Sequence, residues 1–163
     1  KSKYLAEELC KDYAKRFGIK VVILRPFNLF GDLQKKGFLI PNIIQCIKNN
    51  NSMLITNKNN KRDYLLIDDF IDVILKMIDF DCKFEIFNIG SGKSYSFEKI
   101  INLFEKKSGK IIKKEYKISK KNNIPKIQAN ISKISKKTGW NPKYNFEEGV
   151  EKILLEKKLL SEQ

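Results

Sequence analysis

Two side chains with useful hydrogen-bonding chemistry stand at the ends of predicted strands. Asn28 follows a β-branched run, residues 19 to 25, that predicts a buried strand of a parallel sheet. Open α/β folds bind ligands at the carboxyl ends of such strands, where an amide can donate to and accept from a hydroxyl or a phosphate. Arg62 begins a second extended segment, and a guanidinium matches two phosphate oxygens at once. The two residues predict a ligand that carries phosphate and hydroxyl groups.

Both residues also have a structural interpretation. Asn28 could bond the backbone of its own loop, and Arg62 could form a surface ion pair with Asp63 or Asp68. We interpret Asp68 and Asp69 as helix-capping and structural residues rather than catalytic ones, with Asp68 as the cap of the helix that follows.

Metal and membrane sites are not indicated. The chain has no histidine, and its three cysteines, Cys10, Cys46 and Cys82, are far apart, so a zinc site of the usual ligands is not expected. The cysteine usage favours a reduced, cytoplasmic protein. No apolar run approaches the roughly 18 residues that span a bilayer. Lys1 begins a charged amphipathic helix, which is unlike a signal peptide.

The formal net charge of +14 has two interpretations. A phosphate-rich partner, nucleic acid included, is the functional one. Compositional bias is the other, because nearly all the basic residues are lysines that accompany abundant Asn and Ile. We favour the second, because lysines spread over many helix faces usually serve solvation.

Helical and extended segments alternate, which predicts an α/β domain in a chain of 163 residues. We expect helices at residues 2–17, 41–48, 68–78, 97–107, 130–139 and 146–160. We expect strands at residues 19–25, 53–56, 63–67, 84–89 and 110–118. In the helix at 68–78 the apolar residues are expected to face inward; they are Phe70, Ile71, Ile74, Leu75 and Ile78. Trp140 is expected to pack against the terminal helix.

Five segments in order resemble one family, the NAD-dependent epimerases and dehydratases of the extended short-chain dehydrogenase/reductase class. Lys3-Tyr4-Leu5-Ala6-Glu7 resembles the end of the Y-x-x-x-K-x-x-x-E signature, and Arg25 to Gly31 resembles R-P-x-N-x-Y-G. The other three resemble R-D-Y-x-x-V-x-D, Y-N-I-G-S-G and L-G-W-x-P, and they begin at Arg62, Phe87 and Gly139. The resemblance covers the chain from Lys1 to about residue 155.

The resemblance implies a fold and a boundary. It implies the C-terminal part of a Rossmann-like fold with a small α/β substrate-binding domain over residues 1–163. The N-terminal dinucleotide-binding half, with its glycine-rich fingerprint, is expected to be absent. The family's catalytic tyrosine would lie two residues before Lys1, outside this sequence.

The resemblance also implies roles for single residues. Lys3 would lower the pKa of the tyrosine one helical turn before it and would bond the nicotinamide ribose; without the flanking motif it would be one more solvated lysine. Pro26 and Phe27 would line the nicotinamide pocket. The residues expected to contact substrate are Asn28, Leu39, Ile40, Arg62 and Lys120.

Two segments depart from the patterns of known binding sites. Where many family members carry an Arg and an acidic residue, this chain has Lys120 and Asn123, which puts the contact with the nucleotide ribose in doubt. Gly90-Ser91-Gly92 lacks the spacing of a phosphate-binding loop, and we interpret it as a turn before a helix capped by Ser96.

The function expected is that of an NAD(P)-dependent nucleotide-sugar epimerase, similar to UDP-glucose 4-epimerase, that works through a 4-keto intermediate. This chain alone is expected to be inactive. The alternatives are a 4,6-dehydratase or reductase of the same family and, from another class, a basic nucleic-acid-binding module. The partners expected are a UDP- or TDP-sugar and a second subunit, with no nucleic acid and no membrane. No metal site is expected.

Overall fold

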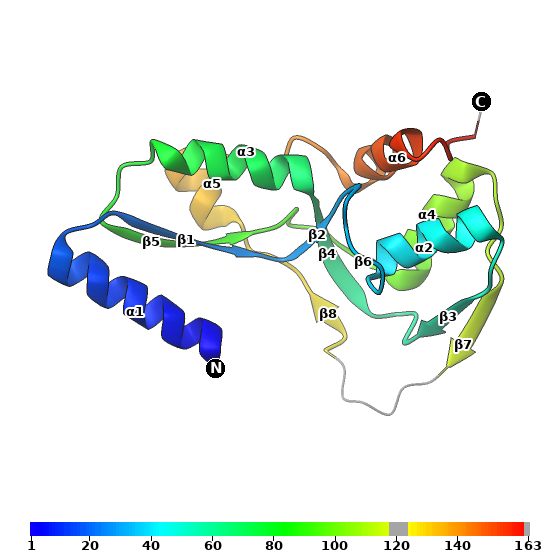
Figure 1. Ribbon diagram of the computed structural model, residues 1–163, viewed down its shortest axis with the longest axis horizontal. Coiled ribbons are helices and arrows are strands. Elements are labelled where there is room, and N and C mark those ends of the chain that lie inside the picture. Colours follow the sequence, from blue (N-terminus) through cyan, green and yellow to red (C-terminus); the bar gives the residue numbers. More distant parts are fainter. Residues whose placement is uncertain (118–123, 162–163) are drawn as a thin grey trace.

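The computed structural model describes residues 1–117 and 124–161. Figure 1 shows the elements in two groups side by side, with α1, β1, β5 and α5 in one and α2, α4, β3 and β7 in the other. Strands β2, β4, β6 and β8 lie between them. The α/β class predicted from the sequence is confirmed.

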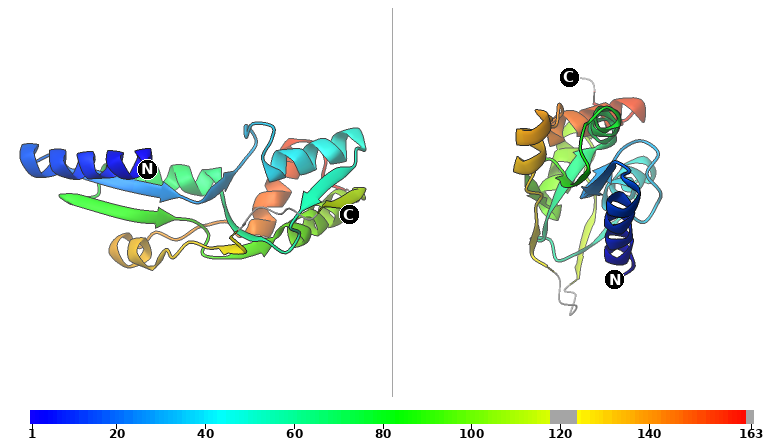
Figure 2. Two further views of the ribbon diagram at one scale, coloured as in Figure 1. Left: turned by 90° about the horizontal axis from the view of Figure 1, so that it is seen from below. Right: turned by 90° about the vertical axis from the view of Figure 1, so that its left-hand side faces the viewer.

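The first group is built on a pair of parallel strands. Strand β1 (Val21–Pro26) pairs with β5 (Phe84–Ile89), so that Arg25 stands opposite Asn88. Helix α1 (Ser2–Phe17) ends at Gly18, whose φ of 67° is the left-handed conformation that glycine adopts freely. Helix α1 lies along one side of the strand pair and α5 (Ser132–Thr138) along the other (Figure 2).

The strands between the two groups are built on β4. In the parallel direction β4 (Lys61–Leu66) pairs with β2 (Asn28–Phe30) and β8 (Lys126–Ile127), and in the antiparallel direction with β6 (Ser94–Ser96). Strands β3 (Met53–Thr56) and β7 (Lys114–Lys117) form a separate parallel pair. The remaining helices are α2 (Leu39–Asn49), α3 (Ile67–Ile78), α4 (Phe97–Ser108) and α6 (Phe146–Glu156).

Local sequence signals fix several helix starts. The Ser96 side chain accepts a hydrogen bond from the Lys99 backbone N–H and caps α4, as predicted. Asn145 and Glu148 form a reciprocal capping box at the start of α6. The prediction that Asp68 caps α3 is wrong, because α3 begins one residue earlier, after Leu66, and has no side-chain cap.

The core has two parts. The larger contains residues of α2, α4 and α6, with Phe30 and Tyr64 among them. The smaller contains Leu65, Val73, Phe87, Ile89, Ile134 and Trp140. Trp140 therefore belongs to the core, but it packs with residues of α3, β5 and α5 and not in the cluster of the terminal helix.

The predicted inward face of α3 is wrong for Ile71, Leu75 and Ile78, whereas Phe70 packs against the smaller core as predicted. Val73 and Asp69 are the buried residues of α3, whereas Ile71, Leu75 and Ile78 are 50%, 59% and 73% exposed. A hollow of about 320 Å³ between α3 and β1 is lined by Val22, Leu24 and Ile74 among others. The apolar spacing marks a face that could be covered, but it does not say what covers it.

Candidate functional site

The amino end of α1 points in the direction in which β1 runs, toward the second group of elements (Figure 1). Helix α1 runs antiparallel to β1 (Figure 1), so its first turn lies toward the carboxyl half of β1. Lys3 is exposed in this turn, and Phe27 is half-buried. One turn after Lys3, Glu7 accepts a hydrogen bond from Nε of Arg25 at 2.8 Å. The carboxyl end of β1 and the helix that bears Lys3 are thus linked by an ion pair.

Asn28 is held by a neighbouring strand. It is the first residue of β2, where the sequence predicted a loop, and its register partner is Tyr64. The Asn28 Nδ2 donates to the backbone oxygen of Asp63 at 2.8 Å. The amide thus bonds β4 and not its own loop, and it remains exposed.

Arg62 is held by backbone carbonyls. Its Nη1 donates to the oxygens of Lys61 and Ile124 at 2.8 and 2.9 Å, and its guanidinium carbon lies 5.8 Å from the centre of the Phe97 ring. The ion pairs described for residues 1–117 and 124–161 include none between Arg62 and Asp63 or Asp68, and Asp68 pairs with Lys152 at 2.6 Å. The surface-pair alternative for Arg62 finds no support in these contacts.

The carboxylate of Asp63, the residue after Arg62, is fully buried and joins three segments of the chain by hydrogen bonds. Asp63 is 0% exposed. It accepts from the backbone N–H and hydroxyl of Ser91 at 2.8 and 2.7 Å. It also accepts from the backbone N–H groups of Gly92 and Ala129, both at 3.0 Å. Sequence reasoning treated Asp63 only as a partner for Arg62, although an aspartate inside a strand is unusual enough to be a signal.

The same contacts settle the role of the Gly90-Ser91-Gly92 turn. Its N–H groups point to the Asp63 carboxylate, so an internal anion occupies the position that a phosphate would take. A Cβ on Gly90 would lie 2.5 Å from the Ala129 Cβ. The interpretation as a turn is confirmed, and glycine is needed at position 90 for close packing.

Leu39 and Ile40 begin α2 rather than precede it. Ile40 is 1% exposed and belongs to the larger core, whereas Leu39 is half-buried. Any contact of Ile40 with a ligand must therefore come from its backbone.

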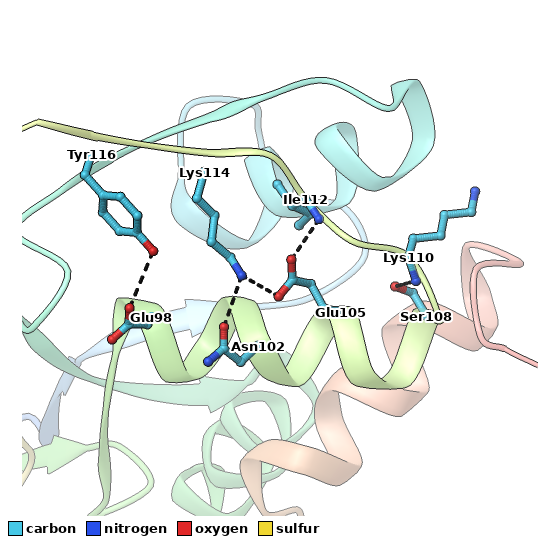
Figure 3. A network of polar contacts seen from close by, with 8 residues as sticks. All are labelled: Glu98, Asn102, Glu105, Ser108, Lys110, Ile112, Lys114 and Tyr116. Carbon is cyan, nitrogen blue, oxygen red and sulfur yellow. Dashed lines mark hydrogen bonds and ion pairs between the residues drawn. The ribbon is translucent and has the colours of Figure 1, made fainter.

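Lys120 lies outside the described residues, but the strand that leads to it is well anchored. Figure 3 shows β7 and the residues before it bonded to α4. Lys114 Nζ donates to Glu105 Oε2 at 2.6 Å, and the Ile112 backbone N–H donates to Glu105 Oε1 at 2.7 Å. Because Glu105 is mostly buried, with 15% of its side chain exposed, this contact fixes where β7 starts.

A hollow between β2, α3 and α6 lies away from these residues. A pocket of about 530 Å³ is lined by residues of β2, α3, α6 and the loop after β2, and none of the predicted site residues lines it. The lining of this pocket is mainly apolar, whereas Asn28 and Arg62, next to Asp63, offer hydrogen-bond donors for a ligand that carries phosphate and hydroxyl groups. In the part of the chain that is described, no cluster of metal-ligating side chains is found. No helix there has the length and apolar character needed to cross a membrane.

Comparison with known proteins agrees with these motifs. The sequence model of the family described as GDP-mannose 4,6 dehydratase matches residues 1–153. The chain belongs to the extended short-chain dehydrogenase/reductase family of NAD-dependent epimerases and dehydratases. The family resemblance inferred from the five motifs is confirmed.

Named relatives within this extended short-chain dehydrogenase/reductase family differ in activity. A putative UDP-glucose 4-epimerase of Methanocaldococcus jannaschii is 27% identical over 94% of this chain and 50% of its own length. A dTDP-4-dehydro-6-deoxyglucose reductase of Escherichia coli is 28% identical, with the same coverage of 94% and 50%. The chain thus spans about half the length of these curated relatives.

Solved structures of the extended short-chain dehydrogenases/reductases show the same fold. A UDP-glucuronic acid 4-epimerase of Bacillus cereus, in complex with UDP-glucuronic acid and NAD, superposes with a TM-score of 0.81 at 28% identity. This likeness covers 92% of this chain and 50% of that one. A UDP-glucose 4-epimerase of Thermotoga maritima gives a TM-score of 0.87 at 24% identity, over 96% of this chain and 52% of that one. The Rossmann-like extended fold that the motifs implied is confirmed.

Proposed function

We propose that this chain forms the substrate-binding half of an NAD(P)-dependent nucleotide-sugar epimerase. In the intact enzyme a sugar hydroxyl would be oxidised to a 4-keto intermediate and then reduced again on the other face. The observation that carries the proposal is the arrangement around Asp63. The backbone oxygen of Asp63 holds the amide of Asn28, and Arg62 is the residue before it. A donor suited to hydroxyls and a donor suited to phosphates are therefore tied to neighbouring positions of β4.

The residues near the carboxyl end of β1 fit the nicotinamide end of the cofactor. Lys3, Pro26 and Phe27 belong to elements that the Glu7–Arg25 ion pair connects. When bound, the cofactor supplies the acceptor for a hydride. Lys3 would bond the ribose and, by its positive charge, lower the pKa of a tyrosine phenol one helical turn earlier, so that the phenolate can take the proton of the sugar hydroxyl. Most of the cofactor would contact the N-terminal half that this sequence does not contain.

Substrate would be held by β2, β4, the start of α2 and the segment after β7. Arg62 would bind the diphosphate, Asn28 a sugar hydroxyl or phosphate, and the start of α2 at Leu39 and Ile40 would cover the nucleotide. Lys120 would add a point charge for the phosphates. The relatives named for UDP-sugars support a UDP- or TDP-sugar, whereas the reductase among them supports the alternative of a dehydratase or reductase.

Dimerisation through α1 is part of the proposal. The apolar side of α1 is open, with Leu5 and Leu9 each 61% exposed and Phe17 65% exposed. A second subunit would bury this face, as the family resemblance implies. We expect the intact enzyme to be a cytoplasmic homodimer and this chain alone to have no catalytic activity.

The competing class is a basic nucleic-acid-binding module, and affinity measurements separate the two. The chain would be titrated with UDP, TDP, UDP-glucose and a generic oligonucleotide at low and high salt. We expect saturable nucleotide binding that weakens at least about tenfold in Arg62→Ala, because a guanidinium–phosphate contact is worth roughly 1.5–3 kcal/mol. Arg16→Ala is the matched control, because Arg16 pairs within α1, away from β4.

The result that contradicts the proposal is equally specific. Tight oligonucleotide binding that falls steeply with salt, together with no binding of nucleotides or nucleotide-sugars, would favour the nucleic-acid module.

A further inference from the structure

The ion pair between Glu7 and Arg25 joins α1 to the sheet in a defined geometry. Nε of Arg25 donates to Oε1 of Glu7 at 2.8 Å, and Nη2 donates to the second oxygen, Oε2. A guanidinium that donates to both oxygens of one carboxylate is fixed in direction as well as in distance. This pair therefore restrains both the position of α1 along β1 and the rotation of α1 about its own axis.

Helix α1 has few other restraints. None of its residues is buried. Its other ion pair joins Asp12 and Arg16 within the helix, so it cannot set the position of the helix. Among the described residues, the Glu7–Arg25 pair is the only hydrogen-bonded side-chain link between α1 and another element. Glu7 has only 17% of its side chain exposed, so solvent competes less for this carboxylate than for its neighbours.

Both ends of the pair adjoin residues assigned to the cofactor. Glu7 follows Lys3 by one helical turn and lies on the same face of α1. Arg25 is the residue before Pro26 and Phe27 in the chain. A slip of α1 along β1 would therefore move the Lys3 ammonium relative to Pro26 and Phe27 without changing either segment internally.

We propose that Glu7 and Arg25 are positioning residues that hold the ammonium group of Lys3 at the carboxyl end of β1. The inference rests on the function proposed above, because Lys3 acts on a phenol and a cofactor only in that enzyme. Neither Glu7 nor Arg25 is assigned a contact with substrate, and both act through Lys3. The pair is ionised at neutral pH, since the Arg25 guanidinium lowers the pKa of the Glu7 carboxyl.

The position of α1 relative to β1 can be measured in this chain without the catalytic reaction. A nitroxide attached at Lys3→Cys, with the three native cysteines replaced by serine, should broaden the backbone amide signals of Phe27 and Asn28. Hydrogen exchange of the α1 amides, measured with the native cysteines in place, reports the same docking independently. We expect Glu7→Gln to abolish the broadening and to speed α1 exchange at least about fivefold, while α4 amides are unchanged.

Two further variants make the test specific. The exchanged pair Glu7→Arg/Arg25→Glu should recover part of the broadening, because it restores an ion pair across the same two positions. Asp12→Asn removes an equivalent Arg–carboxylate pair from the same helix, and we expect it to leave the broadening unchanged. Equal effects of Glu7→Gln and Asp12→Asn, or no effect of Glu7→Gln on either readout, would overturn the proposal.

Catalysis gives a second readout in a full-length protein that carries the preceding tyrosine. There Glu7→Gln should lower kcat and shift its pH profile to higher pH, because a displaced ammonium no longer favours the phenolate. KM for the nucleotide-sugar should stay the same, since Asn28 and Arg62 lie on other elements. An unshifted pH profile would overturn the positioning role. Failure of the proposed function gives a different result. The wild-type chain would bind no nucleotide-sugar, while the nitroxide broadening and the hydrogen exchange would still report whether α1 is docked.

Discussion

The Asp63 carboxylate accepts a hydrogen bond from the backbone N–H of Ala129 at 3.0 Å, across 66 positions of the chain. The same carboxylate receives the N–H groups of Ser91 and Gly92. Three segments that are distant in sequence therefore meet at one buried anion. Because Arg62 precedes Asp63 and Asn28 bonds its backbone oxygen, the proposed substrate contacts depend on this meeting point.

Replacing Asp63 should damage stability more than replacing a surface aspartate. In Asp63→Asn the amide NH₂ would face N–H donors, and we expect unfolding free energy to fall by about 3 kcal/mol, as for a broken buried charge network. Asp72→Asn is the control: Asp72 pairs with Lys143 at the surface, and its loss should cost less than about 1 kcal/mol. Urea denaturation measures both. Similar losses in the two variants would contradict the role given to Asp63.

Gly90 tests the close packing at the same point. In Gly90→Ala the new Cβ would meet the Ala129 Cβ at 2.5 Å and Asp63 Oδ2 at 3.0 Å. We expect a loss of about 1–3 kcal/mol, the usual cost of overpacking. Adding Ala129→Gly removes the closest atom and should restore part of the stability. A double-mutant cycle with no coupling energy between the two positions would show that the packing argument is wrong.

The capping box of α6 should contribute measurably to stability. Asn145→Ala removes the acceptor for the Glu148 backbone N–H, which lies 3.1 Å from Asn145 Oδ1. We expect a loss of about 1 kcal/mol. Asn141→Ala is a matched control in an exposed turn, where the side chain makes only a long contact of 3.4 Å to the Gly139 oxygen. Equal denaturation midpoints for the Asn145 variant and the wild type would contradict the assignment of the cap.

Tyr64 should make stability fall at high pH. Burial raises the pKa of Tyr64 to about 12 in the folded chain, from the ordinary tyrosine value of 10.0. The folded state holds this proton more tightly, so the contribution is complete below pH 10.0 and is lost as pH rises toward about 12. Burial also raises the pKa of Tyr95, so the ultraviolet absorbance of tyrosinate should show late-titrating phenols, of which Tyr64→Phe removes one. If that variant leaves the titration curve unchanged, the environment assigned to Tyr64 is wrong.

Elements with strong local signals were predictable from the sequence. Strand β5 has the predicted bounds, and the caps at Ser96 and Asn145 were read from residue type alone. Strands β2, β6 and β8 were missed because they have three residues or fewer and depend on pairing with β4. Helix α6 ends at Glu156, short of the predicted end at residue 160.

The sequence proposed the members of the candidate site but did not show which residues hold them in place. Family motifs pointed to Lys3, Asn28 and Arg62, whereas no local pattern shows that Asp63 would meet residues 91, 92 and 129. That contact arises from tertiary packing. The apolar face of α3 was misjudged for a related reason: periodicity identifies Ile71, Leu75 and Ile78 as one face, but it contains no information on which segment covers that face.

The most direct test of the central claim is a map of where a nucleotide-sugar binds. Backbone amide shifts of the isotopically labelled chain would be recorded during titration with UDP-glucose. We predict that the largest saturable shifts fall at Asn28, Arg62 and the start of α2, and that they are lost in Arg62→Ala. Shifts spread over exposed lysines without saturation, or none at Asn28 and Arg62, would contradict the account.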